Sequence, residues 1–104
     1  MDKGELIIAP AALEDLEQIW HYTATKASND IADRILDEVY DRFDLLAMAP
    51  LMGRTRSELA ENLHSISIDP LVIFYRPTER GVAIARVISA EQDLDRIAQE
   101  GGLE

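Results

Sequence analysis

Hydrophobic residues recur at helical spacing along two long stretches of this chain. A short apolar strand is expected at 6–9, and a helix should follow over 10–25, where a proline suits the first turn. A second helix is expected from a cap at Ser28 or Asn29 to about Met48, just before another proline. Because the connection between these helices is short, they should pack as an antiparallel hairpin.

After the helices the pattern changes to the two-residue period of β-strands. His64, Ile66 and Ile68 alternate with serines, which predicts a strand with one buried face. Two runs rich in β-branched residues follow at 71–76 and 82–88. The proline and glycine that bracket the residues between these runs predict a β-hairpin.

The order of these elements indicates an α+β fold. We expect an N-terminal strand, a helical hairpin and then a three-stranded antiparallel sheet that packs against the helices. A loop is expected over 51–57, a turn of helix over 57–61 and a last short helix over 93–99. With 104 residues and neither repeats nor linkers, the sequence predicts one domain over 1–104.

Composition and charge narrow the function classes. Ten basic residues, only two of them lysines, stand against twenty acidic residues and give a net charge of −10. General binding to nucleic acid is therefore not expected, because such binding depends on cations that neutralise phosphates. Without cysteine the chain has no disulfide, thiol nucleophile or thiolate metal site. No membrane span or secretory signal is expected, so we predict a cytoplasmic protein.

Several stretches, in this order and at these intervals, resemble the ParE branch of the RelE/ParE toxins of bacterial toxin–antitoxin pairs. The helical stretch 11–22 and the second helix over 32–50 are similar to the two helices of that family. The remaining matching stretches are Gly53-Arg-Thr-Arg-Ser-Glu-Leu59, Leu63-His-Ser65, Ile73-Phe-Tyr-Arg76 and Ile84-Ala-Arg-Val-Ile88. The resemblance covers nearly the whole chain.

The resemblance implies a toxin that inhibits DNA gyrase by binding, performs no chemistry and is neutralised by a ParD-like antitoxin. It also implies a toxin–antitoxin hetero-oligomer, in which an antitoxin helix lies in an apolar groove of the helical hairpin and sheet. Two departures bear on toxicity. The chain has His64 where relatives often carry arginine, and of the family's histidine and Arg-Asp tail only Asp93 is present.

Two groups of residues are candidates for these contacts. Arginine binds carboxylates with a two-pronged fork, so a cationic patch with His64 could contact the target or a partner. This first group is Arg54, Arg56, His64, Arg76 and Arg86. The groove candidates are Leu13, Trp20 and Tyr40. Structural roles are the alternative for both groups: ion pairs such as one from the arginine loop to Glu58 or Glu61, and core packing for the apolar residues.

Other functions remain as alternatives. One is a homologue that binds the antitoxin without being toxic, and another is a RelE-like endoribonuclease that cuts ribosome-bound messenger RNA. RNA cleavage needs an acid and a base, and His64 is the only histidine near the expected sheet. Glu14, Glu17 and His21 share one helix face, but without a second ligand-bearing segment we expect no metal and no cofactor. Asp33, Asp37 and Asp41 also share a face, either solvated or facing a cationic partner.

Overall fold

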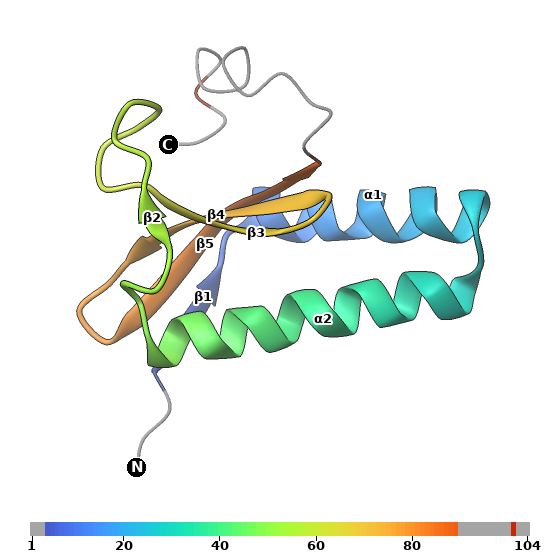
Figure 1. The fold of residues 1–104 in the computed structure, drawn as a ribbon, viewed down its shortest axis with the longest axis horizontal. Coiled ribbons are helices and arrows are strands. Elements are labelled where there is room, and N and C mark those ends of the chain that lie inside the picture. The colour runs from blue at the N-terminus through green and yellow to red at the C-terminus, as the bar shows by residue number, and fades with distance from the viewer. Residues whose placement is uncertain (1–3, 90–100, 102–104) are drawn as a thin grey trace.

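The computed structural model describes residues 4–89 and residue 101 (Figure 1). Two helices lie side by side as an antiparallel hairpin, and the strands form one sheet beside them. The elements are β1 (Glu5–Ile8), α1 (Pro10–Lys26), α2 (Asn29–Met48), β2 (Arg54–Thr55), β3 (His64–Ile68), β4 (Leu71–Pro77) and β5 (Gly81–Ser89). The α+β class and the helical hairpin are confirmed.

Local sequence signals account for the ends of both helices. Pro10 occupies the first turn of α1, where a backbone N–H has no helical partner. The Ser28 hydroxyl accepts a 3.1 Å hydrogen bond from the amide of Ile31 and so caps α2, as the sequence predicts. After α2, the amide of Ala49 donates to Leu45 before Pro50 prevents continuation. None of the helices within residues 4–89 is long and apolar enough to cross a membrane.

The expected three-stranded antiparallel sheet is wrong, because the sheet has five strands and is mixed. Its order is β1-β5-β4-β3-β2, and β1 runs parallel to β5, with Glu5 opposite Gly81 and Ile8 opposite Ile84. A Cβ atom at position 81 would overlap the backbone of Glu5, so glycine permits this close approach. The two-residue strand β2 pairs with β3 inside a segment expected to be a loop.

Hydrophobic side chains fill both faces of the central strands. The larger cluster lies between the helices and the sheet and includes Leu16, Val39, Phe43, Leu46, Ile73, Tyr75, Val82, Ile84 and Val87. Because neighbouring strand residues point to opposite faces, Phe74 lies on the other face, with Leu63 and Ile88. A β-bulge at Phe74/Tyr75 shifts the pairing with β5 and changes which residues of β5 face the helices.

The segment that leads from β2 to β3 packs against the cluster of Leu63, Phe74 and Ile88. The carbonyl of Arg56 accepts from the amides of Leu59 and Ala60, and the amide of Arg56 donates to Leu63. The bonds from Leu59 and Ala60 close one turn at residues 57–59, which is shorter than the turn of helix expected over 57–61. The helix expected over 93–99 lies outside the described residues.

Candidate functional site

Arg86 and Asp15 form an ion pair that joins the sheet to α1. The Arg86 Nε and Nη2 atoms donate to the two carboxylate oxygens of Asp15 at 2.7 and 2.9 Å. Asp15 also accepts from the amide of Val87 at 3.0 Å, at the part of β5 that extends beyond its pairing with β1. Bonding to Asp15 raises the pKa of Arg86. This predicted contact residue therefore ties α1 to β5.

Arg56 makes several contacts within the loop that contains it. Its Nε atom donates to Glu58 at 2.8 Å, and one terminal nitrogen donates to the Ser65 hydroxyl at 3.3 Å. The guanidinium also lies over the ring of Phe74, with 5.6 Å between the guanidinium carbon and the ring centroid. Arg56 lowers the pKa of Glu58. The ion pair to Glu58 that the sequence offered as the alternative is therefore present.

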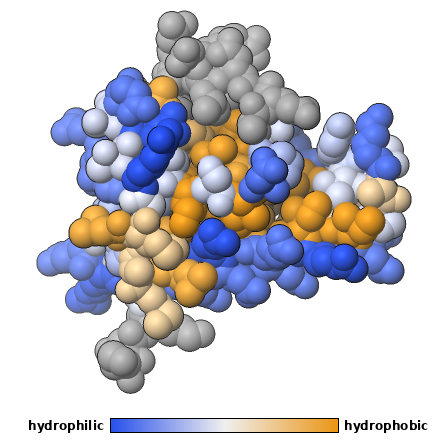
Figure 2. All heavy atoms as spheres, viewed as in Figure 1, coloured by the Kyte–Doolittle hydropathy of each residue, from blue (hydrophilic) through white to orange (hydrophobic). Residues whose placement is uncertain are grey.

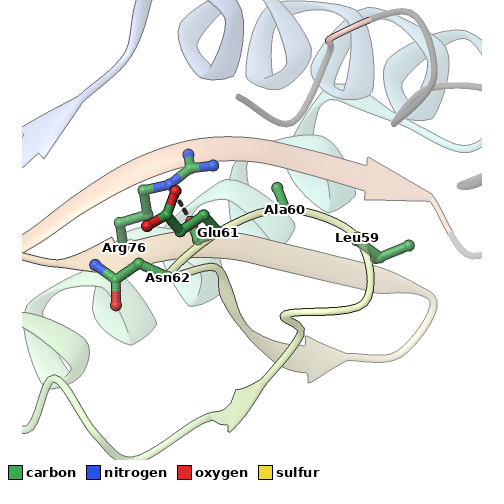
Figure 3. Close-up of a pocket in the computed structure, with 5 residues that line it drawn as sticks. All are labelled: Leu59, Ala60, Glu61, Asn62 and Arg76. Atoms are coloured by element: carbon green, nitrogen blue, oxygen red, sulfur yellow. Dashed lines mark hydrogen bonds between the residues drawn. The ribbon is translucent and has the colours of Figure 1, made fainter.

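Arg76 lines an open hollow of about 570 Å³ beside the turn that precedes β3 (Figure 3). The other lining residues are Leu59, Ala60, Glu61 and Asn62. The Arg76 Nε atom donates to the backbone carbonyl of Glu61 at 3.1 Å, so the guanidinium lies at the hollow's rim. Arg54, by contrast, lies on the exposed strand β2 and presents its side chain to solvent.

His64 is buried and packs against Tyr75. The two ring centroids are 5.6 Å apart, and the His64 Nδ1 atom lies 3.3 Å from the carbonyl oxygen of Asn62. The Tyr75 hydroxyl donates to the carbonyl of Pro50 and accepts from the amide of Gly53, both at 2.9 Å. This pair of rings thus supports the segment that leads into β2.

The structure brings together only part of the predicted cationic patch. In the register of β2, β3 and β4, Arg54 is opposite Ser65, and His64 is opposite Tyr75. Arg56 contacts Phe74, and Arg76 lies one residue beyond Tyr75, so both arginines lie on the sheet face away from the helices. His64 shares the helix-facing side with Tyr75. Arg86 is opposite Phe74 in the register of β4 and β5, and its guanidinium bonds to Asp15 of α1.

The groove candidates lie on one side of the helical hairpin. Leu13 and Trp20 are seven residues apart on α1, and the Trp20 indole donates to Asp33 of α2 at 2.8 Å. Asp33 and Tyr40 are likewise seven residues apart, so helical geometry places all of them on the same side. Leu13 is 48% exposed and Tyr40 is 40% exposed. The ring of Tyr40 packs edge-on against the core residue Phe43.

Two further apolar surfaces include none of the three groove candidates. Figure 2 shows hydrophobic side chains between the two helices. Ile31 of α2 is 40% exposed, and Ile35 and Ile66 are partly buried against the larger core cluster. A second group, Leu45, Met48, Leu51 and Met52, surrounds the C-terminal end of α2. The apolar run Met48-Ala-Pro-Leu-Met52 was the available signal for the second group, but its proline and position predict only a helix end and a loop.

Within residues 4–89 the structure shows no cluster of three His, Asp or Glu side chains that could hold a metal ion. Glu14, Glu17 and His21 are exposed on α1. Asp37 and Asp41 are exposed on α2, whereas Asp33 bonds to Trp20. Glu14, Glu17 and His21 therefore lie on a solvent-exposed face of α1.

Comparisons with known proteins point to one family. The model of the family described as ParE toxin of type II toxin–antitoxin system, parDE, matches residues 6–98. Toxin ParE1 of Mycobacterium tuberculosis is 32% identical over 91 residues, which span 86% of this chain and 93% of that protein. Toxin ParE3 of Caulobacter vibrioides is 25% identical over 91 residues, with 88% and 91% covered. A structure titled as a chromosomal ParDE TA system from P. aeruginosa has the same fold, with a TM-score of 0.72 at 15% identity, covering 84% of this chain and 96% of that chain.

Proposed function

The chain belongs to the ParE toxin family of type II toxin–antitoxin systems, and from this premise we propose that it inhibits DNA gyrase by binding. In this proposal a ParD-like antitoxin neutralises the toxin, and the toxin performs no chemistry of its own. The observation that supports it best is the apolar side of the helical hairpin, where Leu13 and Tyr40 stay exposed beside Trp20.

An amphipathic antitoxin helix fits this side of the hairpin. Exposed apolar side chains on both α1 and α2 would contact the apolar face of the helix, and Asp33 and Glu17 provide polar groups at the margin. Because Trp20 is fixed by its bond to Asp33, the binding surface is ordered before the partner arrives. Preorganisation of this kind lowers the entropic cost of association.

The arrangement of cations favours binding over RNA cleavage. Arg86 is paired with Asp15, Arg56 is paired with Glu58, and the His64 ring packs against Tyr75 in the interior. A nuclease needs such groups to be directed at a phosphate and a hydroxyl of its substrate. Arg54 is the exposed member of the set and is therefore our candidate for target contact.

Replacing Leu13 with glutamate is expected to weaken antitoxin binding by about tenfold, because a charge would enter an apolar contact. Since Leu13 is 48% exposed, the unfolding free energy should change by less than about 0.5 kcal/mol. Titration calorimetry with the purified antitoxin measures the affinity. Gln18→Glu, an exposed position on the same helix, is the matched control. Unchanged affinity for Leu13→Glu would place the antitoxin elsewhere.

Replacing Arg54 with alanine is expected to reduce gyrase inhibition by about tenfold while leaving the fold intact. The side chain is exposed on β2, so its loss should remove a contact with the target and little else. The concentration that halves DNA supercoiling provides the measurement. Arg80→Ala, at the exposed turn between β4 and β5, removes the same charge from another site and should have no effect.

Expression without antitoxin separates the candidate functions. Gyrase inhibition predicts growth arrest with filamentation and DNA-damage signalling, and the purified protein should block supercoiling. Rapid loss of translation with cut messages would instead assign the chain to the ribonucleases. A protein that binds antitoxin but leaves growth and supercoiling unchanged would be an inert homologue.

A further inference from the structure

The C-terminal end of α2 presents a concentrated apolar surface that faces away from the core. Leu45 is 51% exposed, Met48 68%, Leu51 76% and Met52 45%. The four residues are close in sequence, and the amide of Met52 donates to Ala49, which folds the loop against the end of the helix. Figure 2 shows hydrophobic side chains gathered near this end of α2, beside hydrophilic ones along the helix. Exposed clusters of this kind mark interaction sites.

Acidic side chains continue this surface along the same helix face. Asp37, Asp41, Asp44 and Met48 fall at i, i+4, i+7 and i+11, so three carboxylates and the methionine share one stripe. All three aspartates are exposed. Within residues 4–89 their carboxylates take part in neither of the two ion pairs, which are Arg56–Glu58 and Arg86–Asp15.

The helix dipole adds to the negative potential here. The last turn of a helix carries a partial negative charge, which a nearby lysine or arginine normally offsets. The last turn of α2 has no basic residue, and Asp41 and Asp44 lie close to it. Repulsion between these carboxylates and the helix end, and between neighbouring carboxylates, opposes folding. Residues whose local interactions oppose folding tend to occur at functional sites.

We propose that this surface, made of Asp37, Asp41, Asp44, Leu45, Met48, Leu51 and Met52, docks an amphipathic cationic helix of a protein partner. Apolar side chains of that helix would cover the leucines and methionines, and its lysines and arginines would lie over the three aspartates. Methionine adapts its shape to different apolar partners, which suits a docking surface. This goes beyond the proposed function, because the apolar part of the surface lies at the C-terminal end of α2 and includes none of Leu13, Trp20 and Tyr40; helical geometry places Asp37 and Asp44 next to Tyr40, at the edge of that hairpin side.

Charge complementarity excludes the other occupants of an apolar patch. A second copy of the chain would bring the same aspartates to the contact and has a net charge of −10 itself. Anionic lipid headgroups would likewise be repelled by the acidic stripe. A protein segment with positive charges beside an apolar face would pair with the aspartates and also cover the leucines and methionines.

The test uses a synthetic amphipathic helix of about 18 residues, with leucines at i, i+3, i+4 and i+7 and lysines or arginines elsewhere. Titrated into the isotopically labelled full chain, it should shift NMR resonances mainly from residues 37–52. A peptide with glutamates in place of the basic residues should not bind. Shifts spread over the whole acidic surface, or equal binding of the acidic peptide, would overturn the proposal.

Two variants with the same charge change test the assignment to α2. Asp41→Asn/Asp44→Asn should weaken binding of the cationic peptide about tenfold, whereas Glu14→Gln/Glu79→Gln, on α1 and in the turn between β4 and β5, should leave affinity unchanged. Equal weakening by both pairs would show attraction to net charge alone and contradict the proposal. Binding of the protein to phosphatidylglycerol vesicles through Met48 would contradict it as well. None of these outcomes depends on gyrase or the antitoxin.

Discussion

Replacing Asp15 with alanine is expected to lower the unfolding free energy by about 3 kcal/mol. Asp15 accepts three hydrogen bonds, two from Arg86 and one from the amide of Val87. Its side chain is 11% exposed and that of Arg86 is 19% exposed, so water reaches the pair poorly. The alanine variant would remove the acceptor of two guanidinium bonds and of one strand amide.

Thermal unfolding followed by circular dichroism measures this effect, and a fall in Tm of about 15 °C is expected for a domain of this size. Asp15→Asn keeps one acceptor without the charge and should lie between wild type and Asp15→Ala. Glu14→Ala is the control, because that neighbour is exposed. The double variant Asp15→Leu/Arg86→Leu should recover part of the loss, since it removes both charges of the ion pair. A Tm for Asp15→Ala within about 3 °C of wild type would contradict this account.

The helices were predictable because their signals are local. The apolar repeat, the Ser28 cap and the proline after α2 all act within a few residues of the backbone they shape. β3 and the β4–β5 hairpin were predictable for a similar reason, since alternation and a short turn specify an antiparallel pair. These elements were enough to predict the α+β class.

The partner of β1 could not be read from the sequence, because alternation identifies the face of a strand and not its neighbour. β1 and β5 are about 75 residues apart in the chain, and only packing brings Glu5 beside Gly81. β2 has two residues, too few to show any period, and both are exposed. Gly81 was visible as a turn residue, yet its close contact with β1 depends on the assembled sheet.

In the candidate site too, contacts between sequence neighbours could be predicted, whereas contacts between distant residues could not. The sequence identified the arginines and offered ion pairs as an alternative role. Arg56 and Glu58, which form one such pair, are only two residues apart in the sequence. The partner of Arg86 is 71 residues away on α1, beyond the reach of any local pattern. Binding roles for Leu13, Trp20, Tyr40 and the exposed Arg54 stay predictions, which the variants above address.

Tyr75 connects the core of the domain to the loop that carries Arg54. Its ring is fully buried, and its hydroxyl bonds to both Pro50 and Gly53 at 2.9 Å. A Cβ atom at position 53 would lie 2.6 Å from that hydroxyl, so the glycine backbone must pass close to the ring. The loop is therefore held in place by the sheet, and Arg54 follows immediately after the bonded amide.

Replacing Tyr75 with phenylalanine is expected to cost about 2 kcal/mol, because one carbonyl and one amide lose a partly buried partner. Chemical denaturation measures the loss, and Tyr22→Phe, which is 65% exposed, should show none. Burial raises the pKa of Tyr75 above its ordinary 10.0. The contribution of the neutral hydroxyl is therefore fully present below pH 10.0 and is lost as the pH rises through the pKa of the folded state.

The stability difference between wild type and Tyr75→Phe should accordingly shrink as the pH rises above 10.0. The variant should also inhibit gyrase less well than its stability alone explains, because the segment that positions Arg54 loses its anchor. A supercoiling assay at a temperature where both proteins are fully folded separates the two effects. A difference in stability that stays constant above pH 10.0 would contradict the role assigned to the hydroxyl. Unchanged inhibition would show that the loop keeps its conformation without the two bonds.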